Sequence, residues 1–305
     1  MKFLKITVVL LLLVFLGITC NKKKENTTIE SVQTGNITML VDETLLPVIQ
    51  DEVEIFESRF DAKITLLPKS ETEIIIDLMQ DNSKVAIMAR KLTTEEFNNF
   101  QSRKIKPEQA RFAIDAIALI ANKNTKDTIV ALKDIINLLQ QKPQKNIKGL
   151  VFDNPNSSTA RLFNQLAGIT VFPSNGIFSF KTNDEVIKYV SENNGMIGVV
   201  GLNWINNPTP AMKQYLDKIN VLSIIGNSKN SANFPSQNDI AEGKYPLARD
   251  LYIVNCQGFV GLGQGFSTFL TGESGQRIIL KAGLVPVNTP GRKILVRNDI
   301  ENNKK

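Results

Sequence analysis

Three adjacent hydroxyl side chains, Ser157, Ser158 and Thr159, follow a strand-like run at 149–152 and precede a helix-like run at 160–167. The N-terminus of a helix presents unpaired backbone N–H groups and a partial positive charge, so it binds anions without needing lysines. One hydroxyl is enough to cap a helix. Three hydroxyls, with Arg161 close behind, predict an anion-binding turn. The alternative is a helix cap, with Arg161 in a surface ion pair.

Two earlier strand-to-helix turns carry similar donors. Thr44 follows a strand-like run at 37–41, and Ser70 follows another at 62–67. Arg90 ends a third strand-like run at 84–89, and its guanidinium offers a forked pair of donors to an oxyanion. We therefore add Thr44, Ser70 and Arg90 to the candidate ligand contacts. The alternatives are capping for the two hydroxyls and a surface ion pair for Arg90.

The composition excludes several classes of function. The 305 residues are 42% hydrophobic and 22% charged, and they carry a formal net charge of +6 and no histidine. The commonest general base and zinc ligand are therefore missing, so we expect no metal, no cofactor and no enzyme. A phosphatase would need metal-binding Asp and His residues or a nucleophilic His or Cys. The lysines are scattered rather than gathered in a stripe with interleaved aromatics, so we expect no nucleic-acid partner.

The N-terminus has the features of an export signal. A basic start, MKFLK, precedes an apolar run at 6–19, which is short for a membrane span. Cys20 stands where this run stops, and Asn21 and three lysines follow it. We predict a lipoprotein signal peptide at 1–19, acylation of Cys20 and a polar, lipidated tether at 20–35. A plain secretory signal is the alternative, because Thr19 stands where Gly, Ala or Ser is usual.

The rest of the chain alternates between strand and helix patterns, which predicts an α/β protein with a largely parallel sheet covered by helices. The apolar run at 109–122, interrupted by Asp115, is too long for one strand and could be a strand that passes between two lobes. With the strand near 250 it could form a two-strand hinge. The predicted strands are 37–41, 62–67, 84–89, 147–152, 196–200, 220–225, 245–254 and one near 293–297; the predicted helices are 44–60, 71–81, 92–101, 130–140, 158–168, 183–193, 210–219, 264–271 and 273–282.

Several short motifs, in order, resemble those of one family. They are Ile114–Asn122 (IDAIALIAN), Ser157–Thr159 (SST), Gly195–Val199 (GMIGV), Tyr245–Tyr252 (YPLARDLY), Gly275–Gln276 (GQ) and Gly283–Pro286 (GLVP). Together they resemble the phosphate-binding lipoproteins of bacterial ABC transporters, which have the type 2 periplasmic-binding-protein fold. The resemblance covers roughly residues 36 to 295.

The resemblance implies two lobes that close over a ligand. Lobe one would comprise 36–114 and 250–300, and lobe two 115–249. The protein would be lipid-anchored on the periplasmic side of a bacterial membrane, capture a small oxyanion such as inorganic phosphate, and deliver it to an ABC permease. Thr44, Ser70 and Arg90 would contact the anion from lobe one, and the hydroxyl cluster and Arg161 from lobe two.

The departures from the family pattern leave two questions open. Arg90 stands about where the family has an acid that accepts the proton of hydrogen phosphate and so rejects sulfate. Asp153 replaces an arginine that precedes the hydroxyl cluster in the family. Another oxyanion, such as sulfate or molybdate, is therefore an alternative ligand. A surface lipoprotein or sensor that keeps the fold without transport is the alternative function.

The predicted lipidation has a direct test. Replacing the acyl acceptor in Cys20→Ala is expected to leave a protein that is either uncleaved or freely soluble. Intact-mass measurement of the membrane-extracted wild-type protein checks this, because residues 1–19 should be missing and Cys20 should carry lipid. Residues 1–19 still attached, or an unmodified Cys20, would contradict it.

Overall fold

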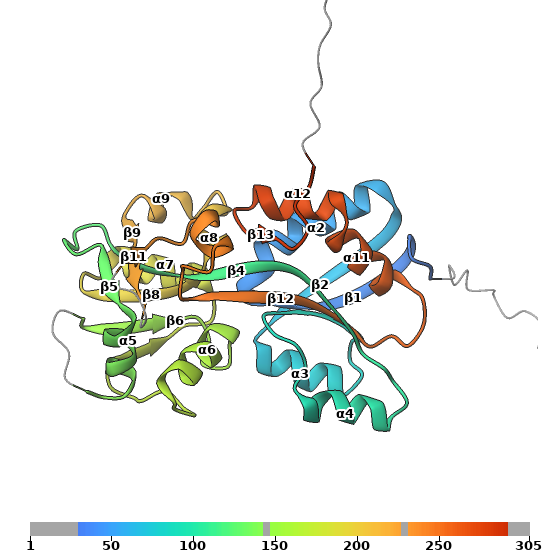
Figure 1. Ribbon diagram of the computed structural model, residues 1–305, viewed down its shortest axis with the longest axis horizontal. Helices are drawn as coiled ribbons and strands as arrows, with labels where there is room; N and C mark the ends of the chain where they lie inside the picture. Colours follow the sequence, from blue (N-terminus) through green and yellow to red (C-terminus); the bar gives the residue numbers. More distant parts are fainter. Residues whose placement is uncertain (1–29, 143–146, 227–230, 292–305) are drawn as a thin grey trace, which may run out of the picture.

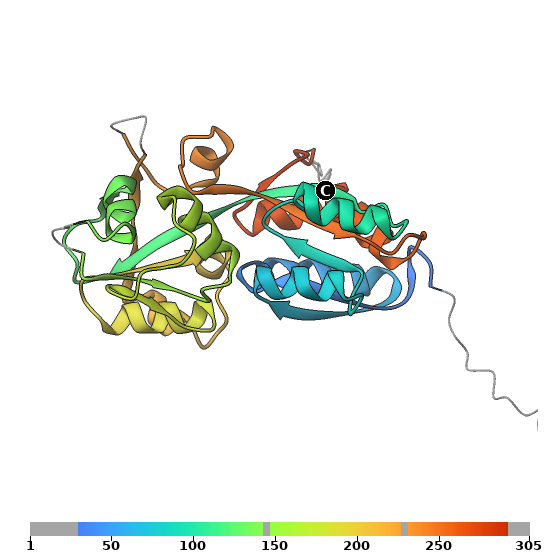
Figure 2. The same ribbon diagram turned by 90° about the horizontal axis from the view of Figure 1, so that it is seen from below.

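Two α/β lobes lie side by side along the long axis of the molecule, joined by two strands that run between them (Figures 1 and 2). This is a computed structural model, and it describes residues 30–142, 147–226 and 231–291. The predicted signal peptide, Cys20, most of the tether and the predicted strand near 293–297 lie outside these residues. Within the described ranges, no helix has the length and apolar character that crossing a membrane requires.

The first lobe is built on a parallel sheet in which β1 is central, with β2 on one side and β3 on the other. The helix α2 forms because Val48, Ile49, Val53 and Phe56 recur at helical spacing, and all four are buried. Thr93 caps α4, since its hydroxyl accepts a hydrogen bond from the Glu96 N–H at 3.2 Å. The elements are β1 (Thr34–Asp42), η1 (Glu43–Leu45), α2 (Leu46–Arg59), β2 (Asp61–Lys69), α3 (Glu71–Met79), β3 (Val85–Met88), α4 (Thr94–Ser102), α11 (Leu262–Thr271), α12 (Glu273–Lys281) and β13 (Val285–Pro286).

The two connecting strands are β4 (Glu108–Asn122) and β12 (Ala248–Asn255), which pair with each other antiparallel. Residues 108–116 of β4 pair with β12, whereas residues 117–122 pair with β8 and β9 of the second lobe. The prediction that this run was too long for one strand is wrong. A single strand of 15 residues fits because each half belongs to a different lobe.

The second lobe repeats the plan around parallel strands β6, β7 and β8. A separate small sheet of β11, β10 and β5 packs at its far end. Its elements are β5 (Ile129–Ala131), α5 (Leu132–Leu139), β6 (Gly149–Phe152), α6 (Ser158–Ala167), β7 (Ile177–Ser179), α7 (Asn183–Glu192), β8 (Met196–Gly201), α8 (Leu202–Asn206), α9 (Lys213–Leu216), β9 (Ile219–Val221), β10 (Ser223–Ile225), β11 (Ala232–Asn233) and α10 (Gln237–Ala241).

The hydrophobic cores follow the same division. One cluster of buried side chains includes Ala116 and Leu247 and belongs to the second lobe. Another includes Ala113 and Leu251 and lies in the first lobe, where a smaller third cluster packs below α3 and α4. The change of cluster along the connecting strands supports the predicted lobe boundaries, which stay a prediction.

Two predicted elements are wrong in part. The helix predicted at 210–219 shrinks to α9, because Pro208 and Pro210 keep the preceding segment out of regular helix. The strand predicted at 220–225 divides at Leu222 into β9, which pairs with β4, and β10, which pairs with β5. Leu222 is buried, and its N–H bonds to the Leu119 carbonyl at 2.8 Å. Because of this break, residues 219–221 and 223–225 pair with strands of two different sheets.

A neutral acid inside lobe one makes stability depend on pH. Glu52 on α2 is fully buried, neither carboxyl oxygen has a hydrogen-bond partner among the described residues, and burial raises its pKa to about 9. Because the folded pKa is raised, the folded state holds this proton between pH 4.5 and 9 while the unfolded state releases it, so its stabilising contribution falls as pH rises. Relative to Glu52→Gln, the wild-type free energy of unfolding should fall by about 2–3 kcal/mol between pH 6 and pH 8.

Urea denaturation of both proteins at the two pH values measures this difference. Comparison with the variant cancels the contributions of the other carboxyl groups. A difference between the two proteins that does not change with pH would show that Glu52 is ionised in the folded state.

Candidate functional site

A buried ion pair lies on the two connecting strands. Arg249 of β12 stands directly opposite Asp115 of β4 in the strand register. Its Nη2 and Nε lie 2.8 and 3.1 Å from Asp115 Oδ2, and both side chains are buried. A charge inside a protein requires a counter-charge and hydrogen bonds. Each residue therefore depends on the other.

The same guanidinium reaches one hydroxyl in each lobe. Arg249 Nη2 donates to Thr44 Oγ1 at 2.9 Å, and Nη1 donates to Ser158 Oγ at 2.7 Å. The two hydroxyl oxygens are 3.4 Å apart, and both residues are fully buried. Thr44 lies in η1 after the first strand, and Ser158 begins α6. We call Thr44, Asp115, Ser158 and Arg249 the Arg249 cluster; it joins lobe one, lobe two and the connecting strands.

Three more acids lie around the Arg249 cluster. Asp42 is fully buried, and its Oδ1 accepts from the Thr44 N–H at 3.0 Å and hydroxyl at 2.8 Å, while Oδ2 has no partner among the described residues. Burial raises the pKa of Asp42 to about 6 against the opposing effect of Arg249. Burial, and then the nearby Asp153, raise the pKa of Glu43 to about 8. Burial also raises the pKa of Asp153.

Arg249 stays charged in these surroundings. Burial lowers the pKa of its guanidinium, but the carboxylates of Asp115, Asp42 and Asp153 outweigh that effect and hold the pKa above its usual value. Two buried side chains add to the contacts between lobes. Asn203 Nδ2 and Trp204 Nε1 donate to the Thr44 carbonyl at 2.7 and 3.1 Å. Together these contacts fix the position of Thr44.

The predicted hydroxyl cluster divides into two roles. Ser158 faces Arg249, whereas Ser157 and Thr159 each donate to Asp153 Oδ1 at 2.6 Å. Ser157 is also the N-cap of α6, since its Oγ accepts from the Ala160 N–H at 3.2 Å. All three hydroxyl-bearing residues are buried. The structure thus brings Thr44 and Ser158 to one point, with Ser157 and Thr159 beside them.

The other three predicted residues are Ser70, Arg90 and Arg161, and they bond to glutamates on α3 and α4 instead. Arg90 Nε and Arg161 Nε donate to Glu71 Oε1 at 2.9 and 2.6 Å, one from each lobe. Arg90 also donates a bidentate pair of hydrogen bonds to the Glu96 carboxylate, at 2.7 and 2.9 Å. Ser70 caps α3, donating its N–H and hydroxyl to Glu73. These contacts match the ion-pair and capping alternatives, and an anion-binding role for the three residues stays a prediction.

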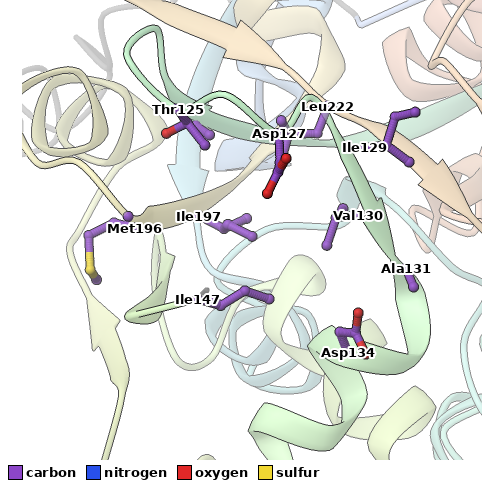
Figure 3. Close-up of a pocket in the computed structure, with 12 residues that line it drawn as sticks. Thr125, Asp127, Ile129, Val130, Ala131, Asp134, Ile147, Met196, Ile197 and Leu222 are labelled. Carbon is purple, nitrogen blue, oxygen red and sulfur yellow. The ribbon is translucent and has the colours of Figure 1, made fainter. Parts of the chain in front are cut away.

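Of two pockets in the structure, one adjoins the predicted site residues and the other does not. The pocket between α3 and α6 is lined by Glu71, Arg90, Ser157 and Arg161 among others, and so adjoins the predicted site. The pocket in Figure 3 lies at the far end of lobe two, where Ile129, Val130 and Ile197 line it together with Asp127. None of the predicted site residues lines this second pocket. The contact between the lobes is therefore the candidate site.

A family profile described as "PBP superfamily domain" matches residues 26–274, which is most of the chain. The chain belongs to the PBP superfamily. The predicted two-lobed α/β fold of the type 2 periplasmic-binding proteins is confirmed. No curated protein sequence matches this superfamily member.

Solved structures of the same fold come from several functional classes. A protein from Clostridium perfringens, described as a "Putative Phosphate ABC Transporter Substrate-Binding Protein with Bound Phosphate", is 19% identical, with a TM-score of 0.68 over 83% of this chain and 100% of that one. An ABC-type phosphate transport receptor from Vibrio cholerae is 18% identical, with a TM-score of 0.60 over 83% and 100%. A mutant form of the OxyR2 regulatory domain from Vibrio vulnificus is 12% identical, with a TM-score of 0.53 over 78% and 94%. At these identities the similarity shows the fold alone.

Sequence reasoning missed the residues at the centre of this region. Arg249, Asp42, Glu43, Asp153 and Asp115 were not predicted to be site residues, although Asp115 and Arg249 lie within two of the motifs that resemble the family. A signal was present, because Asp115 and Arg249 are opposite charges that interrupt two buried strands. Such charges require partners. Their pairing becomes visible only when the two strands are placed side by side.

The Arg249–Asp115 pair should dominate local stability. Arg249→Met or Asp115→Leu alone leaves an uncompensated buried charge and should lower the free energy of unfolding by about 3–5 kcal/mol. The double variant should lose much less than the sum of the two, because neither member of the pair is then left buried without the other. Urea denaturation of the three proteins measures these free energies.

The same strands offer a matched control. Arg111 and Asp250 form a half-exposed pair at 2.8 Å on β4 and β12. Arg111→Met should therefore change the free energy of unfolding by less than about 1 kcal/mol. Additive losses in the Arg249 and Asp115 double variant would show that the two side chains do not depend on each other.

Proposed function

We propose that the protein is an extracytoplasmic, lipid-anchored solute-binding protein that captures inorganic phosphate between its lobes and delivers it to an ABC permease. The observation that carries this proposal is the convergence of donors from both lobes on the Arg249 cluster. Membership of the PBP superfamily supports a binding role rather than an enzymatic one. The two phosphate transport proteins of the same fold support the ligand.

The donor set suits a tetrahedral oxyanion. Arg249 supplies a fixed fork of N–H groups, and Thr44 and Ser158 supply hydroxyls from opposite lobes. The first N–H groups of α6 have no carbonyl partner within the helix and add a partial positive charge. An anion held by these groups would be bound to lobe one, lobe two and the connecting strands together. Binding would therefore favour the closed arrangement of the lobes.

In this proposal, Asp42 takes the role of the acid that the family has at about the position of Arg90. Its Oδ2 is a buried acceptor without a partner among the described residues. Above pH 6 its carboxyl is largely ionised, given a pKa of about 6. It can then accept the proton of hydrogen phosphate, whereas sulfate has no proton to donate. We therefore propose phosphate in preference to sulfate as the ligand.

One alternative keeps the fold without transport. Ser157 and Thr159 already donate to Asp153, and Arg249 is already paired with Asp115. These bonds favour a protein in which the hydroxyls are structural and the site no longer takes up anions. A sensor or partner-binding lipoprotein would then be the function.

Titration calorimetry with phosphate and with sulfate tests the proposed ligand. The wild-type protein should bind phosphate more tightly than sulfate at pH 7.5. Ser158→Ala should lose about 1–3 kcal/mol of phosphate binding, the cost of a hydrogen bond to a charged group. Asp42→Asn should remove most of the preference for phosphate, because an amide cannot take the ligand proton.

Ser58→Ala is the matched control, since Ser58 is exposed on α2 and its hydroxyl donates to the Ile55 carbonyl of the same helix. It should leave both affinities unchanged. Absence of heat and of any rise in melting temperature with either anion would favour the sensor alternative. Phosphate binding that is unaffected in Ser158→Ala would place the ligand elsewhere.

A further inference from the structure

The loop between β12 and α11 exposes apolar side chains at the end of lobe one. We call residues 257–261 the tip loop. Phe259 and Val260 are 52% and 72% exposed, although both are apolar. Gly258 precedes them with a φ of +74°, a left-handed conformation that favours glycine and turns the chain outward. The tip loop thus presents two apolar side chains to the surroundings without packing them on the core.

Basic side chains stand beside these apolar ones. A hollow at the tip loop is lined by Lys104 and Lys106 together with Phe259 and Val260, and Glu108 is the one acid among its described lining residues. Both lysines are exposed, and neither has an ion-pair partner among the described residues. An apolar tip with lysines around it is the pattern of segments that enter the boundary between lipid headgroups and acyl chains.

The N-terminal end of the described chain is fixed to the same loop. The Glu30 carboxylate accepts from Gln257 Nε2 and from the Leu262 N–H, both at 2.8 Å. The following residues press on α11, since a Cβ at Gly265 would lie only 1.8 Å from the Val32 carbonyl oxygen. In both ribbon views the start of the described chain and the loop before α11 lie side by side, at the end away from lobe two (Figures 1 and 2).

This position sets how far the tip loop can be from a membrane. Nine residues, 21–29, separate the predicted lipid-bearing Cys20 from Glu30. Even when fully extended, this segment spans only about 35 Å. Three of its residues, directly after Asn21, are lysines, which anionic headgroups attract. A tether this short keeps the tip loop at high local concentration near the bilayer surface.

We propose that the tip loop is a second membrane contact, in which Phe259 and Val260 enter the headgroup boundary and Lys104 and Lys106 face anionic lipid headgroups. This inference rests on the proposed lipid anchoring of Cys20. A lipid anchor at one end of a flexible tether leaves the protein free to rotate, and an added apolar and basic contact would fix its orientation on the bilayer. The protein would then stand on the end of lobe one, with lobe two directed away from the bilayer.

Tryptophan fluorescence in vesicles with brominated acyl chains tests this contact. The full chain, processed by its host, is reconstituted in phosphatidylcholine containing about one third phosphatidylglycerol. Phe259→Trp places a reporter in the tip loop, and the native Trp204 is buried in lobe two and serves as background. Emission from residue 259 should fall by about half, because bromine quenches only at contact depth.

Phe178→Trp is the matched control, since Phe178 is 42% exposed on β7 of lobe two. Its emission should not be quenched beyond the wild-type level. Adding Lys104→Glu and Lys106→Glu to Phe259→Trp should reduce the quenching at least twofold in low salt. Quenching that is equal at residues 259 and 178, or absent at both, would overturn the proposal.

The outcomes separate this inference from the proposed anchoring. Intact mass shows whether Cys20 carries lipid in the same preparation. Lipidated protein without quenching at residue 259 would overturn the tip-loop contact and leave the anchoring in place. Protein without lipid on Cys20 that also fails to join the vesicles would overturn both. Phosphate titration of the Phe259→Trp protein should match the wild type, because the tip loop is far from the Arg249 cluster.

Discussion

The structure depends on one buried charge. Arg249 lies inside the protein on a strand shared by both lobes, and it stays there because Asp115 stands opposite to it. Removing either partner would leave the other charge buried and uncompensated. The remaining donors of the guanidinium then bond Thr44 and Ser158, so the pair that stabilises the connecting strands also sets the contact between the lobes.

The charge balance around Arg249 restricts what can bind there. Asp42, Glu43 and Asp153 add acids to a region that already holds Asp115, and burial raises the pKa of each. A fully ionised set would repel any anion. In the proposed function, the region would accept an anion only if protons are shared between these acids and the ligand. Hydrogen phosphate would bring such a proton, which is the physical reason that the proposal prefers it over sulfate.

Sequence patterns predicted most elements because the patterns are local. The helical spacing in α2 and the pattern of α4 act within a few residues, and both helices were predicted correctly. The split at Leu222 was missed because it depends on which sheet each half joins. The candidate site was predicted only in part for the same reason. Thr44 and Ser158 follow local rules, whereas the partner of Arg249 is 134 residues away.

The members of the hydroxyl cluster would behave differently if the lobes separated, because they bond to different partners. Arg249 is held by Asp115 on the connecting strands, so it would remain with them. Thr44 and Ser158 belong to different lobes and would move apart, which would free two donors of the guanidinium. Ser157 and Thr159 would keep their bonds, because Asp153 lies on their own lobe. Opening would therefore free donors of Arg249 and the Ser158 hydroxyl for a ligand. Thr44 would keep its bond to Asp42 on its own lobe, and Ser157 and Thr159 would continue to shape the start of α6.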